Sequence, residues 1–217
     1  MTDSVDERNA RADTIVYIVD DNSGVRHSLS LLLQSAGLNT VSCDSVQAFF
    51  DGYDSSRPGC LILDIRMPKM GGLELQKKLA EENIHLPTII ITGHADVLLA
   101  VRAMKAGAFE FFEKPFNDQL LLDSVLLAID KSAEIFLAQR EYVDFHDRVE
   151  LLSAREREVM DLLVRGQGAK EIAAALGISS KTVDVHRGNI LRKIQVRSVP
   201  ELILLTVKHS GPLFSPE

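Results

Sequence analysis

The chain has 217 residues, of which 46% are hydrophobic and 25% are charged, a composition that supports one large hydrophobic core or two small ones. A purely structural or disordered protein is therefore not expected. Lys and Arg number 24 against 31 Asp and Glu, and the resulting net charge of −7 by itself argues against a nucleic-acid partner.

Residues 1–13 are predicted to form a flexible tail, because they are polar and lack the apolar segment of a secretory signal. Nowhere do about 18 apolar residues follow one another, so we expect no transmembrane helix, no membrane partner and a cytoplasmic protein. The two cysteines, Cys43 and Cys60, lack the spacing of a metal site or a redox motif. We expect both to be small buried hydrophobic residues in a reducing compartment.

From residue 14 to about residue 129, short β-branched runs alternate with segments of helical periodicity. The predicted strands are Thr14–Val19, Asn39–Cys43, Cys60–Leu63, Thr88–Ile91 and Ala108–Phe112. The clearest helical segments between them are Val25–Ala36, Leu73–Ala80 and Val97–Ala106. Because parallel strands need crossover connections, five strand-then-helix units predict a doubly wound α/β fold with a five-stranded parallel sheet.

A long helix is predicted from about Asp118 to about His146, since neither Gly nor Pro occurs between Pro115 and Gly166. Its apolar residues follow a nearly heptad spacing, in which Ser132 and Gln139 are the weak members: Leu122, Val125, Ile129, Phe136 and Val143. We expect this helix to act as a stiff linker. Two helices with a kink near Lys131 or Arg140 are the alternative.

The remaining residues predict four short helices that form a helix-turn-helix domain. Ser153 and Glu156 form a capping box before the first helix, and Ser198 and Glu201 repeat it before the fourth, Leu202–Val207. The second helix is Lys170–Leu176, and the third runs from after Ser180 to about Ile194. The expected domains are therefore the tail (1–13), an α/β domain (14–130), a helical linker (131–148) and the small all-α domain (149–217).

Polar side chains follow four of the predicted strands: Asp20 and Asp21, then Asp64, Thr92 and Lys114. The carboxyl ends of strands in a doubly wound sheet open onto one crevice, so we expect these groups to converge. Three carboxylates at close quarters need a cation, and Mg²⁺ prefers such oxygen ligands. Phosphoryl transfer is the economical use of this pocket, with Asp64 as nucleophile, Lys114 and the metal ion neutralising the phosphoryl oxygens, and Thr92 hydrogen-bonding one of them.

Four sequence blocks resemble the receiver domain of bacterial two-component response regulators: VDD at 19–21, LDIRMPKMGG at 63–72, ITGHADV at 91–97 and AMKAGAFEFFEKPF at 103–116. The last two resemble the FixJ branch of the NarL/FixJ family. The resemblance implies a CheY-like receiver domain whose Asp64 accepts a phosphoryl group from a sensor histidine kinase.

The same resemblance implies a role for each pocket residue. Asp20 and Asp21 would hold Mg²⁺ or Mn²⁺ together with Asp64 and the backbone carbonyl of Arg66. Thr92 and Phe111 would form the switch pair. Lys114, followed by a cis bond to Pro115, would contact the phosphoryl group.

The charge is unevenly distributed along the chain. Residues 1–146 carry 13 basic and 22 acidic side chains, whereas residues 147–217 carry 11 and 9, a net charge of +2. At 100° per residue, the third helix of the small domain places apolar residues on one side: Val183, Ile190, Leu191 and Ile194. The other side carries Lys181, Val185, Asn189 and Arg192, which suit phosphates, a thymine methyl group and a base edge.

Two blocks of the small domain resemble the LuxR-type helix-turn-helix: LSAREREVMDLL at 152–163 and KEIAAALGISSKTVDVHRGNILRKI at 170–194. The resemblance implies a recognition helix from about Lys181 to Lys193. The expected DNA-binding residues are Lys181, Thr182, Val185, His186, Asn189, Arg192 and Lys193. It also implies a dimer face on the last helix through Leu202 or Leu205.

We interpret the chain as a transcriptional regulator, not a conventional enzyme, in which phosphorylation of Asp64 promotes dimerisation and promoter binding. Its expected partners are a sensor histidine kinase, promoter DNA, RNA polymerase and a second copy of the chain. One alternative is a Mg²⁺-dependent phosphotransferase, which needs a second carboxylate two residues after the nucleophile, where Arg66 stands. The other is a phosphoacceptor signalling module that does not bind DNA.

Overall fold

The computed structural model describes residues 13–67, 71–93 and 97–209, so the predicted tail, except for Asp13, lies outside the described residues. The chain forms two compact units, residues 1–136 and 137–217, each with its own hydrophobic core. Among the described helices, none combines the length and the apolar character that crossing a membrane requires.

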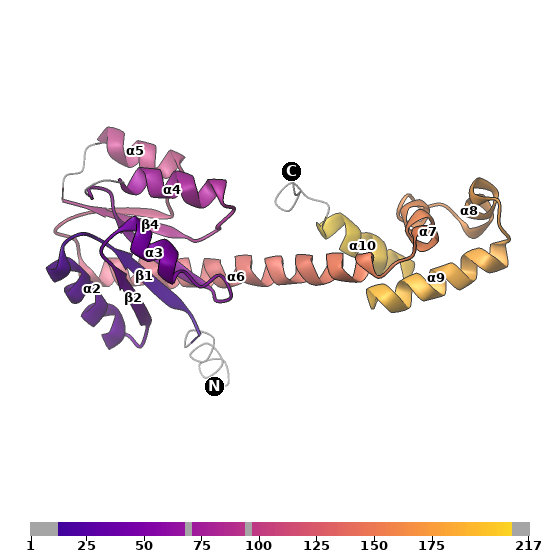
Figure 1. Ribbon diagram of the computed structural model, residues 1–217, viewed down its shortest axis with the longest axis horizontal. Coiled ribbons are helices and arrows are strands. Elements are labelled where there is room, and N and C mark those ends of the chain that lie inside the picture. The colour runs from indigo at the N-terminus through magenta and orange to yellow at the C-terminus, as the bar shows by residue number, and fades with distance from the viewer. Residues whose placement is uncertain (1–12, 68–70, 94–96, 210–217) are drawn as a thin grey trace. The chain divides into compact units, whose positions relative to one another are not determined.

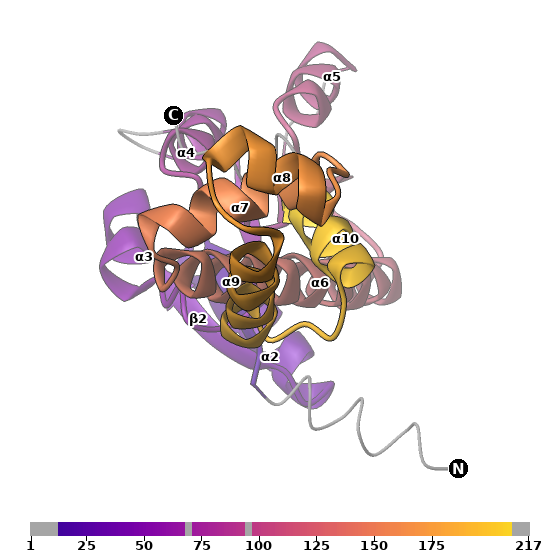
Figure 2. The same cartoon turned by 90° about the vertical axis from the view of Figure 1, so that its right-hand side faces the viewer.

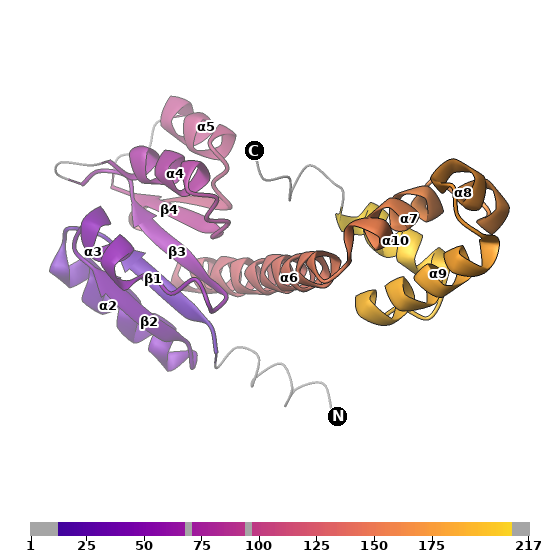
Figure 3. The same ribbon diagram turned by 45° about the vertical axis from the view of Figure 1, so that its right-hand side comes forward.

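Five strands form the sheet of the first unit (Figures 1 and 3): β1 (Ile15–Val19), β2 (Asn39–Cys43), β3 (Gly59–Asp64), β4 (Thr88–Thr92) and β5 (Glu110–Glu113). Each neighbouring pair is parallel, and the strand order is β2-β1-β3-β4-β5. The predicted doubly wound sheet is therefore confirmed. The chain changes direction across the sheet between β1 and β3, which is where such folds bind their ligands.

Helices cover both faces of this sheet (Figure 1). The first face packs against α2 (Ser23–Ser35) and the first part of α6 (Asp118–Glu150). The opposite face packs against α3 (Val46–Gly52), α4 (Gly72–Glu81) and α5 (Val97–Lys105). Because both faces are covered, β1 and β3 are buried along their whole length, which is why they appear in the sequence as uninterrupted apolar runs.

Residues Asp118–Glu150 form one helix of 33 residues, α6, as predicted for a single long helix, and not two separate helices. Part of its apolar seam has a different role from the one expected of a coiled coil. Val125 and Ile129 are buried in the core of the first unit. Ser132 is buried as well, and its hydroxyl accepts a hydrogen bond from the Gly59 N–H at 2.9 Å. The packing of α6 on the sheet therefore extends past residue 130.

Gly59, at the start of β3, leaves no room for a side chain. A Cβ atom added there would lie 2.1 Å from the carbonyl oxygen of Ile15 in the neighbouring strand. We expect Gly59→Ala to destabilise the first unit by about 3 kcal/mol, the upper range for overpacking a close-packed core. Calorimetry of the full chain measures this loss. Gly52→Ala is the matched control, because no atom lies within 4 Å of its added Cβ, and equal transition temperatures for both variants would contradict the prediction.

Four short helices form most of the second unit (Figures 2 and 3): α7 (Ala154–Val164), α8 (Ala169–Leu176), α9 (Ser180–Ile194) and α10 (Val199–His209). The capping box of Ser153 and Glu156 is present as predicted. The second predicted box differs, since the Glu201 carboxylate accepts from the Arg197 N–H, while Ser198 still accepts from the Glu201 N–H at 3.3 Å. The core of this unit joins α7, α8, α9 and α10 to Phe145 of α6.

His209, in the last turn of α10, is buried against the ring of Phe145. The two ring centroids are 5.1 Å apart and the planes are nearly parallel. Neither nitrogen of His209 has a hydrogen-bond partner within the described part of the chain. Burial, together with the neighbouring charge of Lys208, holds the pKa of His209 below its ordinary value of 6.5, although Glu141 acts in the opposite direction.

This environment predicts that acid destabilises the second unit. The unfolded chain takes up a proton at His209 near pH 6.5, whereas the folded protein resists protonation until a lower pH. The free energy of unfolding therefore falls as the pH drops from about 7 through 6.5 towards the folded-state pKa. His209→Leu should make this decline less steep in calorimetry between about pH 7 and pH 5, and His27→Leu, at an exposed position, should not. An unchanged slope in His209→Leu would contradict the prediction.

Candidate functional site

Three carboxylates gather at the carboxyl ends of β1 and β3, where the strand order changes direction. Asp20 and Asp21 follow β1, and Asp64 ends β3. Each contributes one oxygen to a group whose members all lie within 4.8 Å of one another. Asp20 and Asp64 are buried, and Asp21 is exposed. The structure thus brings together the three aspartates that the sequence predicted would converge.

Lys114, which follows β5, joins the two buried carboxylates. Its Nζ lies 2.7 Å from Oδ2 of Asp20 and 2.8 Å from Oδ2 of Asp64. Burial opposes the charge of the ammonium group, but the hydrogen bonds and negative charges of Asp20 and Asp64 outweigh it and raise the pKa of Lys114 above its ordinary value. The next peptide bond, to Pro115, is cis as predicted. Lys114 is therefore a fixed positive charge in the pocket.

Backbone groups orient the same two carboxylates. The Asn22 N–H donates to Oδ1 of Asp20 at 2.8 Å, and the Arg66 N–H donates to Oδ1 of Asp64 at 2.9 Å. The backbone of Gly72, the first residue of α4, packs against the backbone of Asp64. A Cβ atom added to Gly72 would lie only 2.8 Å from the Asp64 carbonyl oxygen. Both side chains are thus held from two sides, with one oxygen on a backbone N–H and the other on Lys114.

The two predicted switch residues lie on neighbouring strands. Thr92 ends β4 and is fully buried, and its carbonyl oxygen accepts the Lys114 N–H at 2.7 Å. Phe111 in β5 is half-buried and packs against a small apolar cluster that includes Ile90 and Ala103. Thr92 is therefore tied through the backbone to the residue that carries the positive charge of the pocket.

The donor set fits a hard divalent cation. Carboxylate oxygens are the ligands that Mg²⁺ and Mn²⁺ prefer, and three of them lie within one ion's reach here. Lys114 balances only one of the three negative charges. A pocket with this composition can bind a cation and can bring a carboxylate oxygen of Asp64 against an electrophilic phosphorus atom.

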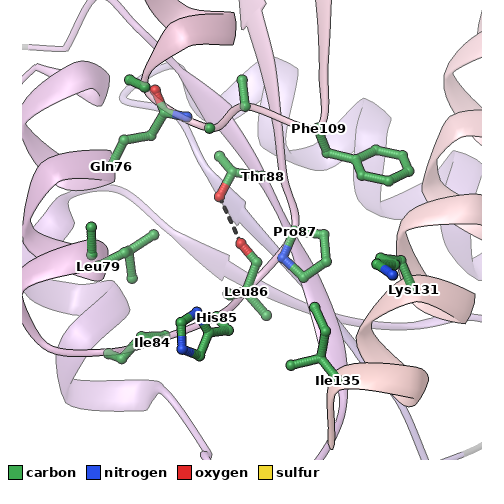
Figure 4. A pocket seen from close by; sticks show the side chains of 14 residues that line it. Gln76, Leu79, Ile84, His85, Leu86, Pro87, Thr88, Phe109, Lys131 and Ile135 are labelled. Atoms are coloured by element: carbon green, nitrogen blue, oxygen red, sulfur yellow. Dashed lines mark hydrogen bonds between the residues drawn. The ribbon is translucent and has the colours of Figure 1, made fainter. Parts of the chain in front are cut away.

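A separate cavity, of about 530 Å³, lies elsewhere in the first unit (Figure 4). Its walls come from α4, the segment Ile84–Thr88, the segment Ala106–Phe109 and α6. The Thr88 hydroxyl, which lines it, donates to the Leu86 carbonyl at 3.0 Å, the hydrogen bond drawn in Figure 4. It has no cluster of acidic ligands like that of Asp20, Asp21 and Asp64 among its described lining residues. This cavity is therefore not the candidate phosphorylation pocket.

The helix α9 has the two faces that the sequence predicted. Val183, Ile190 and Ile194 are buried in the core of the second unit, and Leu191 packs against it. On the other side Lys181 and Arg192 are exposed, and Val185 is 57% exposed. Arg192 donates to Oδ1 of Asn189 at 3.2 Å, which fixes the amide of that residue on the outer face. This face carries an apolar contact, an amide and two positive charges.

Two of the predicted DNA-binding residues, Thr182 and Lys193, form hydrogen bonds within the second unit, and a third, His186, is partly buried. Thr182 shares a hydroxyl hydrogen bond of 2.8 Å with the helix-capping Ser179. Nδ1 of His186 is buried and has no hydrogen-bond partner in the described part of the protein. Lys193 contacts Glu156 and the Leu151 carbonyl instead of projecting freely. Lys193 was expected to bind DNA from the resemblance to the LuxR-type helix, not because of the helical period, and its long side chain reaches Glu156 and the Leu151 carbonyl instead.

The prediction that Leu202 forms part of a dimer face is wrong. It is fully buried in the core of the second unit, and Leu205 packs against the same core. The exposed apolar residues of α10 are Leu204 and Val207, which are three residues apart and lie on one face. In a helix that begins after Ser198, the helical period places Leu204 and Val207 on the side opposite Leu202. Periodicity could therefore have predicted that these two residues, and not Leu202, are exposed.

Two segments of the chain match known families. Residues 16–126 match the family described as response regulator receiver domain. Residues 150–206 match the family described as bacterial regulatory proteins, luxR family. Together these two segments account for most of the chain, and each contains one of the two candidate sites.

The chain aligns with relatives of similar length over most of both sequences. The transcriptional regulatory protein FixJ of Azorhizobium caulinodans is 42% identical over 192 residues, which are 88% of this chain and 91% of the relative. Nodulation protein W of Bradyrhizobium diazoefficiens is 40% identical over 197 residues, 91% and 87% of the two chains. The solved structure of response regulator StyR aligns with a TM-score of 0.80 and 41% identity, covering 90% of this chain and 99% of that chain.

Proposed function

Because the chain belongs to the response regulators that combine a receiver domain with a LuxR-type DNA-binding domain, we propose that phosphorylation of Asp64 controls its binding to promoter DNA. The observation that carries this proposal is the group formed by Asp20, Asp64 and Lys114, in which one ammonium holds two carboxylates at 2.7 and 2.8 Å. We expected a receiver domain at 14–130, a linker at 131–148 and a DNA-binding domain at 149–217. Since Ser132 packs with the first unit and Phe145 with the second, we propose that the two domains meet near residue 136 within α6.

The proposed phosphoryl donor is a phosphohistidine of a sensor kinase. A carboxylate oxygen of Asp64 forms the new P–O bond, the P–N bond breaks, and its electron pair leaves with the histidine nitrogen. Lys114 neutralises an oxygen of the transferred group. A bound Mg²⁺ or Mn²⁺ ion, held by Asp20, Asp21, Asp64 and the backbone carbonyl of Arg66, would supply further positive charge. In this way the chain assists its own phosphorylation and, with water as acceptor, its dephosphorylation.

Thr92 and Phe111 are the proposed route from the pocket to the surface. The Thr92 hydroxyl moves towards the phosphoryl group on Asp64, and Phe111 turns inward into the space that this opens. The neighbouring helix α5 exposes Val97 and Leu98, which are 80% and 71% exposed. This apolar surface supports the proposal that phosphorylation creates a dimer interface between two receiver domains.

The outer face of α9 is the proposed contact with DNA. Lys181 and Arg192 would bind backbone phosphates, and Val185 and Asn189 would contact base edges in the major groove. A dimer would place two such helices on half-sites about one helical turn apart, with Leu204 and Val207 as a second contact between copies. RNA polymerase is the further partner that we propose, and the cytoplasm is the proposed location.

The metal requirement tests the phosphorylation step. We expect acetyl phosphate to phosphorylate the full chain in the presence of Mg²⁺ and to fail after chelation, because Lys114 alone leaves two negative charges in the pocket uncompensated. Intact mass spectrometry measures the phosphoprotein, and peptide mapping identifies the modified residue. Asp21→Asn should raise the Mg²⁺ concentration needed, whereas the exposed Asp51→Asn should not. Phosphorylation of Asp64 at an equal rate without divalent cations would contradict this step.

A further inference from the structure

Two helices of the second unit supply a cation to each other's carboxyl end. Arg148, in the last turn of α6, donates from Nη1 to the carbonyl oxygen of Ile194, the last residue of α9, at 3.1 Å. Lys193 of α9 donates from Nζ to the carbonyl oxygen of Leu151, the residue after α6, at 3.0 Å. The ends of the two helices are thus joined by two hydrogen bonds that run in opposite directions.

These two hydrogen bonds give donors to backbone carbonyl groups that have no donor within their own helix. The last carbonyl groups of a helix have no intrahelical donor and carry a partial negative charge, which favours a cation. Arg157 of α7 adds a third bond of the same kind, from Nη2 to the Glu150 carbonyl oxygen at 3.1 Å. The carboxyl end of α6 is therefore bonded to both α7 and α9.

The two cations that join α6 to α9 are themselves held in place. Lys193 lies 2.7 Å from Oε2 of Glu156, a side chain that is only 5% exposed. The same carboxylate oxygen accepts the Ser153 N–H at 2.9 Å, and the hydrogen bond from Lys193 is the main cause of the lowered pKa of Glu156. Arg148 also forms an ion pair with Asp144. Each cation therefore bonds a backbone carbonyl group and a carboxylate at the same time.

We propose that Arg148 and Lys193 are positioning residues, which hold the recognition helix α9 against the last turn of α6 and so set the orientation in which α9 enters DNA. This inference rests on the proposed DNA binding. It also gives Lys193 a role different from that of its neighbour Arg192. Lys193 acts inside the domain through Leu151 and Glu156, whereas Arg192 on the outer face contacts phosphate.

The test compares specific and non-specific DNA affinity in the full chain. The variants are Arg148→Gln and the double variant Glu156→Gln/Lys193→Gln, which removes the buried pair together and leaves no buried charge unpaired. We expect affinity for a selected duplex to fall about tenfold, the size of effect that loss of a charge-assisted hydrogen bond produces. Affinity for a random duplex and the salt dependence of binding should stay unchanged. The control Arg192→Gln should reduce the salt slope by about 0.9.

Hydrogen exchange in the free protein tests the same contact without DNA. Arg148→Gln should accelerate exchange in the last turns of both α6 and α9, and Arg148→Lys, which keeps a donor for the Ile194 carbonyl, should restore protection. If the protein binds no duplex at all, the proposed function fails while the exchange result still decides whether the two helix ends are coupled. The inference is overturned if the double variant lowers the salt slope as Arg192→Gln does. It is overturned equally if Arg148→Gln leaves specific affinity and exchange unchanged.

Discussion

Replacing Asp64 by Asn is expected to abolish phosphorylation of the chain by acetyl phosphate or by a sensor kinase. The amide has nearly the shape of the carboxylate and can still accept the Arg66 N–H, which lies 2.9 Å from Oδ1, so the fold should be retained. It lacks the negatively charged oxygen that must form the P–O bond. Intact mass spectrometry after incubation with the donor and Mg²⁺ measures the product.

The control for this substitution is Asp51→Asn, an exposed aspartate of α3 that should be phosphorylated like the wild type under the same conditions. Circular dichroism checks that Asp64→Asn is folded. A folded Asp64→Asn variant that still incorporates one phosphoryl group would show that another residue is the acceptor, and Asp20 and Asp21 would be the first to examine.

The double substitution Lys181→Ala/Asn189→Ala is expected to weaken binding to a selected duplex by about 2 kcal/mol or more, roughly 30-fold. Lys181 supplies a phosphate contact at the start of α9, where the helix dipole also favours a phosphate. Asn189, whose Oδ1 is oriented by Arg192 at 3.2 Å, supplies a contact to a base edge. Fluorescence anisotropy at fixed salt concentration measures the change.

Two comparisons separate these contributions. Lys181→Ala alone should weaken binding to selected and random duplexes alike and lower the salt slope by about 0.9, whereas Asn189→Ala alone should affect mainly the selected duplex. Lys77→Ala removes the same charge from α4 of the receiver domain, where Lys77 is exposed and paired with Glu81, and should have little effect. If the double variant binds the selected duplex with wild-type affinity, α9 is not the helix that recognises the DNA sequence.

Strand ends were the most predictable feature of the reactive pocket. Asp20 and Asp64 each follow an apolar run, and in a parallel sheet such positions necessarily meet at one edge. The bounds of the seven-residue helix α3 were not predicted, although a helix was expected after each strand, because two turns hold too few residues to show a helical period. The sequence also could not reveal that Ser132 of α6 bonds to Gly59, since that contact joins residues distant along the chain.

Side chains of the second unit show the same limit. The inner face of α9 follows from the helical period, and Val183 and Ile190 are buried as predicted. The period assigns a residue to a face by the direction of its Cβ atom, but it does not tell where the ammonium group of a long lysine ends. Lys193 was expected to contact DNA as part of the LuxR-type recognition helix, whereas in the structure its ammonium group lies against Glu156.

The most direct test of the account is the affinity of the full chain for DNA with and without phosphorylation. A duplex recovered by selection from a random pool serves as the target, and the dissociation constant is measured at fixed salt concentration with Mg²⁺, before and after treatment with acetyl phosphate. We expect binding about tenfold tighter after phosphorylation, within the usual range for coupling between two sites, and no change in Asp64→Asn. Equal dissociation constants for the unmodified chain and for the chain phosphorylated at Asp64 would contradict it.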